Sequence, residues 1–491
     1  MIGGGRNRER QVNRVGENVA EVRSLPLVVD LDGTLLKSDL LIESFFSLLS
    51  SRPLHALAAL VALANGKAAL KARIADSAVV DLSRLPLNED FLAILRREKA
   101  DGRKIYLASA SHGRYVRPLA EHLGLFDGVF ASDDAVNLAG AAKAAALCEA
   151  FGEGGFDYAG DAAADFAVWR KARQALVVNA AAGVIARARA ELPRVRVIGS
   201  RSASWRDWLR ALRVHQWAKN LLIFVPPLAG HRFGPVLLEC LVAFFSFSLC
   251  ASSVYLLNDL VDMRSDRHHP SKGRRPFASG ALPLLHGLAL VPVLLAASLA
   301  LAWRQPWQFL LVLLGYYGLT LGYSLLLKRK MTTDIVTLAC LYGIRLVAGS
   351  VAAGVPLSPW LAAFSIFLFL SLALVKRCTE LIVRAEAGQG DPPGRGYRLR
   401  DLPVLEAMAA ASGYLAVLVM ALYINSPAVV TLYRRPGLLW LSCVILIHWV
   451  SRMLIITHRG EMHDDPMIFA ATDRGSLISA GLMAAVFLAG M

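Results

Sequence analysis

The chain has 491 residues, of which 55% are hydrophobic and only 19% are charged. This mixture is too apolar for a soluble protein, and the apolar residues dominate after about residue 215. Lys and Arg held on the cytoplasmic side of a membrane explain the formal net charge of +15. Because no basic module with interleaved aromatic residues is present, no nucleic acid is expected as a partner. The six cysteines are scattered without a C-x-x-C pair, so neither a disulfide framework nor a zinc site follows.

Residues 1–24 carry no apolar segment of the kind that a secretory signal needs, and a disordered cytosolic tail is expected there. Residues 25–198 alternate short apolar runs with helical patterns. The runs LPLVVDLDGT, KIYLASAS, GVFASD, FDYAGD and ALVVNA are typical of buried parallel strands. They predict an α/β doubly wound domain, whose ligands bind at the carboxyl ends of the strands. The interval between the first two strands exceeds one crossover helix, which predicts a helical cap at about residues 38–98.

The motif DLDGT places Asp30 and Asp32 at the end of the first strand, beside a sharp turn. With a phosphate bound there, Asp30 could attack phosphorus while Asp32 protonates the leaving oxygen. A retained fold without turnover, serving as a regulatory or docking domain, is the alternative. Further polar candidates follow in the chain: Ser109, Lys143, Asp161 and Asp165.

The order of these residues, over about residues 25–185, resembles the haloacid dehalogenase superfamily of phosphatases. The resemblance implies that Asp30 is the nucleophile and a Mg²⁺ ligand, and that Asp32 is the general acid and base. It also implies that Ser109 and Lys143 bind the phosphate. The remaining roles carried over are those of the Mg²⁺ ligand Asp161 and of Asp165, which supports that site.

Residues 199–491 are expected to form an all-α membrane domain of nine transmembrane helices. Loops and segment ends on one side carry 17 Lys and Arg, and the opposite loops carry four. The positive-inside rule then places the N-terminal domain and the basic loops in the cytoplasm, in a multi-pass protein of the cell inner membrane. The nine segments are expected at residues 215–231, 236–257, 281–302, 306–327, 333–353, 359–381, 402–424, 437–457 and 475–491.

Directly after the second of these segments the chain reads NDLVDMRSDRHHP. If the helix continues, Asn258, Asp262 and Asp266 recur at four-residue spacing and share one face. Asp259 lies beside the first of them. Carboxylates arranged in this way need a compensating cation, and hard oxygen ligands suit Mg²⁺ that bridges to substrate phosphates. A solvated loop that merely ends a helix is the alternative. The following SKGRRPFASG offers three partners for phosphate oxygens: Lys272, Arg274 and Arg275.

This segment resembles the N-D-x-x-D-x-x-x-D signature of the UbiA superfamily of intramembrane prenyltransferases, which have nine helices. The resemblance covers about residues 205–491. A second acidic motif of the family would fall in YSLLLKRKMTTDIVTLACLYGIRLVAG. There Asp334 is the one candidate metal ligand, because Leu338 stands four residues later. The first motif implies binding of Mg²⁺ and a diphosphate by Asn258, Asp259, Asp262 and Asp266.

The lone Asp334, followed by Arg345 and Gly349, is similar to the decaprenyl-phosphate phosphoribosyltransferase branch, as are the segments RVHQWAKNLLIFVPPLAG and LVKRCTEL. That branch takes phosphoribosyl diphosphate as donor and a polyprenyl phosphate as acceptor. The extra 5′-phosphate of such a donor needs more cations. Each candidate cation could equally set the membrane topology or contact lipid headgroups. The candidates are Lys219, Lys328, Arg329, Arg345, Lys376 and Arg377.

Two other functions compete with this interpretation. An aromatic polyprenyltransferase, such as one acting on 4-hydroxybenzoate in quinone synthesis, would take a polyprenyl diphosphate as its donor. A transporter or lipid-binding scaffold has no need of an acidic Mg²⁺ motif. The neighbouring His268 and His269 are expected to face solvent or phosphate rather than a metal. Ionisable residues near the cytosolic segment ends predict a polar cavity that opens to the cytosol. A loop with Asp464, Asp465 and Asp473 is expected to face this cavity.

Overall fold

A computed structural model describes residues 25–62, 66–77, 80–133, 136–200, 204–232, 234–269, 272–392, 395–462 and 465–491. The predicted tail at residues 1–24 and the loop residue Asp464 lie outside the described residues. The chain divides into two compact units. The first contains Met1–Ala211 and Leu256–Ala289, and the second contains Leu212–Tyr255 and Leu290–Met491. The stretch that carries NDLVDMRSDRHHP therefore belongs by its contacts to the first unit.

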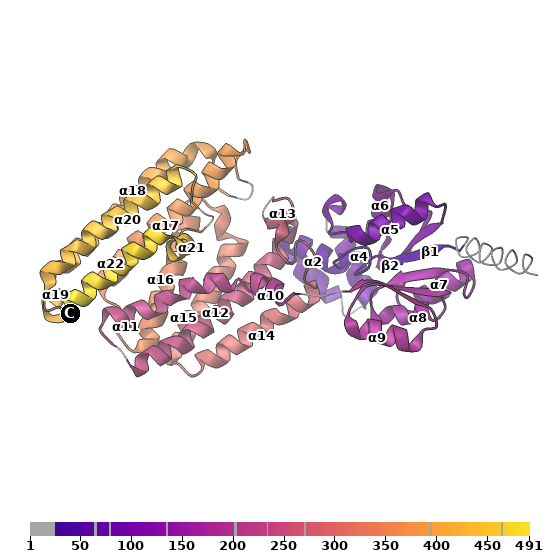
Figure 1. Ribbon diagram of the computed structural model, residues 1–491, viewed down its shortest axis with the longest axis horizontal. Coiled ribbons are helices and arrows are strands. Elements are labelled where there is room, and N and C mark those ends of the chain that lie inside the picture. The colour runs from indigo at the N-terminus through magenta and orange to yellow at the C-terminus, as the bar shows by residue number, and fades with distance from the viewer. Residues whose placement is uncertain are drawn as a thin grey trace, which may run out of the picture. The chain divides into compact units, whose positions relative to one another are not determined.

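The first unit contains a six-stranded sheet with the strand order β3-β2-β1-β4-β5-β6 (Figure 1). All five pairings are parallel, so the predicted doubly wound α/β domain is confirmed. The order reverses between β1 and β4, and ligands of such sheets bind outside the carboxyl ends of the strands at this point. One strand, β6, was not among the five predicted. The strands are β1 (Leu27–Asp30), β2 (Ile105–His112), β3 (Gly128–Ser132), β4 (Asp157–Gly160), β5 (Gln174–Ala180) and β6 (Val195–Ser200).

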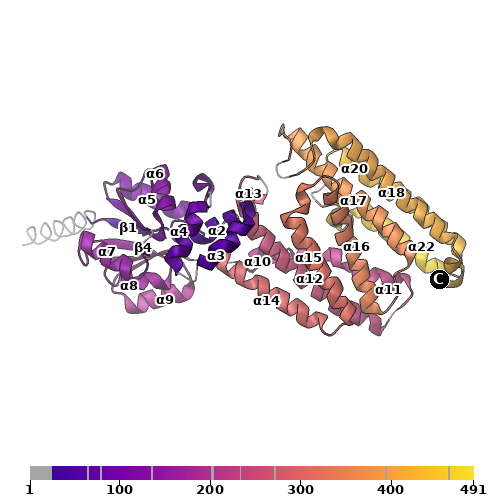
Figure 2. The same cartoon turned by 180° about the vertical axis from the view of Figure 1, so that it is seen from behind.

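Helices cover both faces of this sheet, α5 and α6 on one and α7, α8 and α9 on the other (Figure 2). Successive side chains of a strand point to opposite faces. Val29 accordingly packs with Phe91 of α5 and Leu119 of α6. Its neighbour Val28 packs in a separate cluster with Leu147 of α7. The bounds are α5 (Glu89–Ala100), α6 (Gly113–Leu123), α7 (Ala141–Phe151), α8 (Phe166–Trp169) and α9 (Ala182–Glu191).

Helices lie between β1 and β2, but the predicted cap at residues 38–98 reaches too far, because α5 packs against the sheet. Asp39 begins the helical insertion, because its side chain accepts a hydrogen bond from the backbone N–H of Ile42 at 3.1 Å and so caps the first helix. The insertion contains α2 (Leu40–Ser51), α3 (Pro53–Val61), α4 (Lys67–Ser77) and the 3₁₀ turn η2 (Leu82–Arg84).

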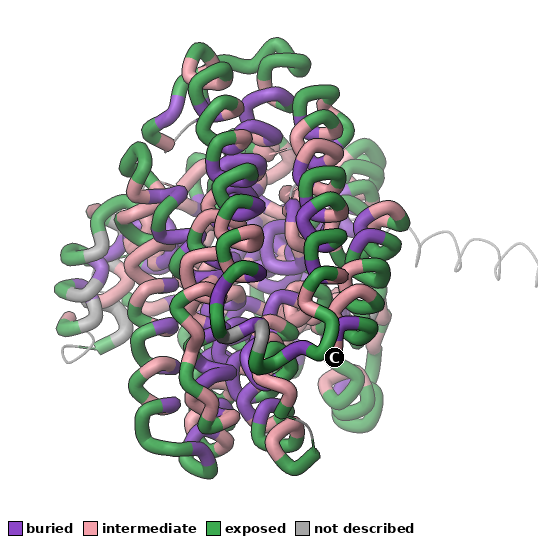
Figure 3. The backbone as a smooth tube through the Cα atoms, turned by 90° about the vertical axis from the view of Figure 1, so that its left-hand side faces the viewer, coloured by how far each residue is buried: buried purple, intermediate pink, exposed green. Residues whose placement is uncertain are grey.

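Among the described residues, seven helices are long and apolar enough to cross a membrane. Exposed residues recur along the long helices (Figure 3), and many are large apolar side chains such as Leu238, Val293 and Leu488. Such surfaces suit lipid rather than water. The seven are α12 (Pro235–Val261), α14 (Leu284–Ala302), α15 (Trp307–Leu325), α16 (Thr333–Ala353), α17 (Pro359–Glu386), α18 (Leu402–Ile424) and α20 (Trp440–His458).

The structure does not confirm the predicted count of nine spans, because the first and last segments are shorter than the rest. The first is a 3₁₀ helix, η4 (Val214–Phe224), followed by the five-residue α11 (Val225–Ala229). Prolines at positions 226 and 227 suit a helix start rather than a helix interior. The last is α22 (Arg474–Gly490), of 17 residues.

A close backbone contact joins α16 to η4 in the second unit. A Cβ atom added to Gly349 would lie 2.0 Å from the carbonyl oxygen of Ile223. We therefore expect Gly349→Ala to lower the free energy of unfolding by about 2 kcal/mol, since an extra methyl group has no room there. On the same helix, Gly343→Ala meets nothing within 4 Å and should change it by no more than about 1 kcal/mol. Unfolding in mixed detergent micelles measures both, and equal stabilities would contradict the contact.

Candidate functional site

The first site lies at the carboxyl ends of β1 and β4. Asp30 ends β1, and Lys143 of α7 places its Nζ 2.6 Å from Asp30 Oδ1. The same Nζ donates to the hydroxyl of Tyr158 at 3.0 Å. That hydroxyl in turn donates to Asp165 Oδ1 at 2.9 Å. All four side chains are buried. Two carboxylates, an ammonium and a phenol thus form one buried chain of hydrogen bonds at the carboxyl ends of β1 and β4.

Three carboxylates of this site converge. One oxygen each of Asp30, Asp161 and Asp165 lies within 4.8 Å of the others. Burial raises the pKa of Asp30 well above its usual range, although Lys143 opposes the rise. One lysine leaves an excess of negative charge beside these three groups. Hard oxygen donors with excess negative charge are what Mg²⁺ requires, so the residues fit this ion.

Asp32 lies on the other side of the turn and is held by three donors. Its Oδ2 accepts from Ser111 Oγ at 2.7 Å and from Ser109 Oγ at 3.2 Å. Its Oδ1 accepts from the backbone N–H of Leu40 at 2.8 Å. Ser109 was predicted and is fully buried, whereas Ser111 was missed. Their spacing of two residues puts both on one face of β2, and this signal is visible in KIYLASAS.

The turn that follows Asp32 requires glycine. Gly33 has φ +84°, and a Cβ there would lie 2.2 Å from Asp161 Oδ2. Only glycine adopts such a backbone without strain. The missing side chain also lets the loop after β4 bring Asp161 against the turn. The D-x-D-G-T motif therefore supplies both carboxylates and the space for a third.

The acidic motif lies at the end of α12 and on the short helix that follows a break at Asp262. The shared face of Asn258, Asp262 and Asp266 stays a prediction. Backbone N–H groups of Asp262 and Asp266 donate to the carbonyls four residues earlier, at 2.8 and 2.9 Å. Asp262 stands between α12 and α13 (Met263–Arg267). The structure brings together Asp259 and Asp266, whose carboxylates both accept from Nη1 of Arg275, at 3.2 and 2.7 Å.

Two carboxylates that converge on one cationic nitrogen are able to share a cation. Burial raises the pKa of Asp266 to about 6, although Arg275 opposes the rise. In the described part of the chain, this motif has no three carboxylates as close together as those beside β1. Of the predicted phosphate partners, Arg275 thus lies against the acids. Lys272 and Arg274 lie in the adjacent 3₁₀ turn η5 (Lys272–Arg274), and Arg274 is exposed.

In the second unit, Asp465 holds two of the predicted cations. Its Oδ2 lies 2.5 Å from Lys219 Nζ and 3.5 Å from Lys376 Nζ. Its Oδ1 accepts from the backbone N–H of Met467 at 3.1 Å and so caps α21 (Pro466–Thr472). The sequence marked this loop as cavity-facing without giving it a role. Here Asp465 fixes the position of two ammonium groups from η4 and α17.

These ion pairs predict a pH-dependent stability. Burial by itself raises the pKa of Asp465, but Lys376 and Lys219 outweigh it and the net pKa is lowered. A carboxylate whose pKa is lower in the folded state stabilises above its unfolded pKa of about 4, and the contribution is lost as pH falls further. We expect Asp465→Asn to cost about 3 kcal/mol at neutral pH. Glu461→Gln, at an exposed position, should cost almost nothing. Thermal unfolding between neutral and acid pH checks both, and a cost that grows with acid would contradict the assignment.

Asp334 is fully buried at the start of α16 and is surrounded by donors. Its Oδ2 lies 2.6 Å from Arg377 Nε, and its Oδ1 accepts from the hydroxyl of Tyr323 at 2.9 Å. Arg395 approaches to 3.6 Å and also donates to the backbone carbonyl of Lys328 at 3.3 Å. Glu380 also contacts both arginines, so two guanidinium groups are shared by two carboxylates. These ion pairs favour the orientation of Arg377 over metal binding by Asp334.

Arg345 is the remaining predicted cation. Its Nε donates to Asn220 Oδ1 at 2.8 Å, and its Nη2 donates to the hydroxyl of Tyr316 at 3.2 Å. Asn220 is itself held by Ser248 at 2.9 Å. The second unit thus buries Lys219, Arg345 and Arg377. Buried cations at membrane depth are costly and usually functional.

Comparison with known proteins finds a family match for each of the two parts of the chain. Residues 227–472 match the UbiA prenyltransferase family, and residues 27–170 match the haloacid dehalogenase-like hydrolases. The uncharacterized protein y4nM of Sinorhizobium fredii is 36% identical over 473 residues, which cover 96% of this chain and 92% of that one. The nodulation protein NoeC of Azorhizobium caulinodans is 36% identical over 275 residues, covering 55% and 89%.

A further relative is a decaprenyl-phosphate phosphoribosyltransferase of Mycolicibacterium smegmatis, 37% identical over 186 residues. These cover 37% of this chain and 58% of that protein. The sequence prediction of two fused enzyme domains is confirmed by the two family matches. The chain belongs to the UbiA prenyltransferase family and carries an N-terminal haloacid dehalogenase-like hydrolase domain.

Proposed function

We propose that residues 199–491 transfer a phosphoribosyl group from phosphoribosyl diphosphate to a polyprenyl phosphate, at the cytoplasmic face of the cell inner membrane. The observation that carries this proposal is the environment of Asp334. Leu338 stands where the second acidic motif would have its other carboxylate. Arg377 and Arg395 contact both Asp334 and the neighbouring acid Glu380. Cations in place of a second metal suit a donor with an additional phosphate. The named activity of the mycolicibacterial relative points the same way.

Asp259, Asp262 and Asp266 would hold Mg²⁺, which would neutralise the departing pyrophosphate. In the second unit, Lys219, Lys376 and Arg345 would offer positive charge to phosphate oxygens. A lipid phosphate oxygen attacks C1 of the ribose while the bond from C1 to the pyrophosphate oxygen breaks. The acceptor is already an anion, so no residue has to remove a proton. Positioning and electrostatics then supply the rate. In this arrangement η4 with α11 and α22 complete nine membrane helices.

The hydrolase domain would remove the 5′-phosphate from the phosphoribosyl lipid. Lys143 holds Oδ1 of Asp30, so the other carboxylate oxygen attacks phosphorus. Asp32, held by Ser111 and the backbone of Leu40, gives a proton to the leaving ribose oxygen. It then takes one from the water that hydrolyses the aspartyl phosphate. The products are a ribosyl phospholipid and inorganic phosphate.

An assay of the purified protein in detergent with Mg²⁺ tests which substrate donates the transferred group. Labelled phosphoribosyl diphosphate and polyprenyl phosphate should give label in the lipid fraction. A parallel reaction receives polyprenyl diphosphate and 4-hydroxybenzoate. Prenylated hydroxybenzoate, with no label in the lipid of the first reaction, would replace the proposal with an aromatic polyprenyltransferase. An absence of product in both would point to a non-enzymatic membrane domain.

A further inference from the structure

A buried ion pair joins the helical insertion of the hydrolase domain to the acidic motif. Arg267 is the last residue of α13 and directly follows Asp266. Its Nη1 and Nη2 donate to the two carboxylate oxygens of Glu43, on α2, at 2.9 and 2.6 Å. The side chains are 9% and 5% exposed. Paired donors on a planar guanidinium fix orientation as well as distance. The ion pair therefore holds the last residue of α13 in a defined position against α2.

The third donor group of Arg267 holds the loop that follows α13. Its Nε donates to the backbone carbonyl of Ala278 at 2.9 Å. Two residues later, Gly280 has φ +73°, and a Cβ there would lie 2.7 Å from the Cβ of Lys37. Lys37 belongs to the turn that follows the nucleophile strand, and its backbone N–H donates to the carbonyl of Pro86 at 2.9 Å. At Gly280, the loop after the acidic motif therefore lies directly against the turn that contains Lys37.

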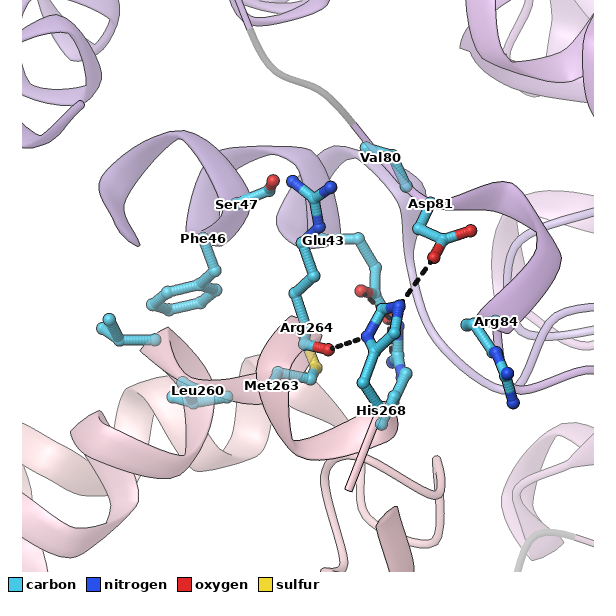
Figure 4. Close-up of a pocket in the computed structure, with 12 residues that line it drawn as sticks. Glu43, Phe46, Ser47, Val80, Asp81, Arg84, Leu260, Met263, Arg264 and His268 are labelled. Atoms are coloured by element: carbon cyan, nitrogen blue, oxygen red, sulfur yellow. Dashed lines mark hydrogen bonds and ion pairs between the residues drawn. The ribbon is translucent and has the colours of Figure 1, made fainter. Parts of the chain in front are cut away.

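Further contacts surround the ion pair. Glu43, Phe46 and Ser47 of α2 line one small pocket together with Leu260 and Met263 (Figure 4). In the same pocket, His268 lies with Nε2 3.0 Å from Asp81 Oδ2. Its other ring nitrogen lies 2.9 Å from the backbone carbonyl of Arg264. Apolar packing, an ion pair and a histidine contact thus surround the short helix α13.

We propose that Glu43 is a positioning residue for the transferase and acts through Arg267 on Asp266. This inference rests on the proposed function of the acidic motif. Arg267 and Asp266 are neighbours on a helix of five residues, so the ion pair that anchors one sets the direction of the other. Asp266 shares Arg275 with Asp259, and a shift of α13 would separate the two carboxylates. The hydrolase domain is then a structural part of the transferase, whether or not its own substrate is present.

Glu43→Gln in the full-length protein tests this role. It leaves Arg267 buried without its counter-charge, which disrupts a buried pair far more than replacing both partners does. We expect the KM for phosphoribosyl diphosphate and the Mg²⁺ concentration for half-maximal rate to rise at least about tenfold. A merely structural role would lower the active fraction, and hence kcat, with KM unchanged. Glu153→Ala breaks an exposed Glu–Lys pair of the same domain and should leave KM as it is.

A double-mutant cycle separates action through Arg267 from a direct effect of Glu43. If Glu43 acts through Arg267, the variant carrying both Glu43→Gln and Arg267→Gln is no worse in KM than Arg267→Gln alone. Fully additive effects, or a KM for Glu43→Gln equal to that of Glu153→Ala, would overturn the inference. Turnover of p-nitrophenyl phosphate by the same samples reports that the hydrolase domain is folded. If the unmodified protein transfers no phosphoribosyl group, the proposed function itself fails, and that outcome is separate from either result of the cycle.

Discussion

Asp262→Asn should lower phosphoribosyl transfer to the lipid by about 100-fold or more, with hydrolysis of p-nitrophenyl phosphate unchanged within about twofold. The amide keeps the shape of the side chain but removes the charge through which the motif would hold Mg²⁺. Asp262 stands between α12 and α13, and its side chain makes no cap hydrogen bond to α13, so α13 should survive the change. Label incorporated into extractable lipid, at saturating donor, measures the effect.

The matched control for this substitution is Asp207→Asn. Asp207 lies on α10 (Trp205–Ala211), where it pairs at 3.5 Å with an exposed Arg210. Exposed pairs of this kind contribute little, so transfer should stay within about twofold of the unmodified protein. Full transfer by Asp262→Asn would show that the acidic motif is no cation site. The diphosphate chemistry would then have to be assigned to other residues.

Asp30→Asn should stop release of phosphate from the lipid product, by about 1000-fold or more, because a carboxamide cannot replace the nucleophile. The transferase would continue, and the 5′-phosphorylated lipid would accumulate as its end product. Mass spectrometry of the lipid extract distinguishes the phosphorylated from the dephosphorylated species directly.

Asp90→Asn, at an exposed position in the first turn of α5, is the control for Asp30→Asn and should give the lipid composition of the unmodified protein. An identical lipid composition for Asp30→Asn and the unmodified protein would mean that the hydrolase site does not act on this lipid. The domain would then be left with its structural contacts to the acidic motif.

The fold of the hydrolase domain could be predicted because five of its parallel strands have a recognisable local sequence pattern. VVDLDGT joins a buried apolar run to a turn that only Gly33 permits, and the pattern recurs at β2, β4 and β5. β6 was missed because Arg196 and Gly199 interrupt the apolar residues of VRVIGS, unlike those of the buried runs. The first predicted span is divided in the structure, for a reason of another kind. Its hydropathy is high, but Pro226 and Pro227 divide it into a 3₁₀ helix and one short turn.

The candidate sites were predictable where the motif carries the chemistry and not where the partners come from distant segments. Asp30 and Asp161 follow from strand ends, but Tyr158 joins the site only because its strand lies beside β1. Likewise, nothing local relates Asp465 to Lys219, which is 246 positions away. The ion pair between Glu43 and Arg267 spans 224 positions. Periodicity predicts which residues of one helix or strand share a face, whereas such ion pairs depend on how separate elements pack.

The most direct test of a transferase followed by a phosphatase is a time course with doubly labelled donor. Phosphoribosyl diphosphate carrying ³²P in the 5′-phosphate and ³H in the ribose is supplied with polyprenyl phosphate and Mg²⁺. Both labels should enter the lipid together, after which ³²P should leave as inorganic phosphate while ³H stays in the lipid. A lipid fraction that never gains ³H would contradict the transfer step. A ratio of ³²P to ³H that stays constant in the lipid would contradict the phosphatase step.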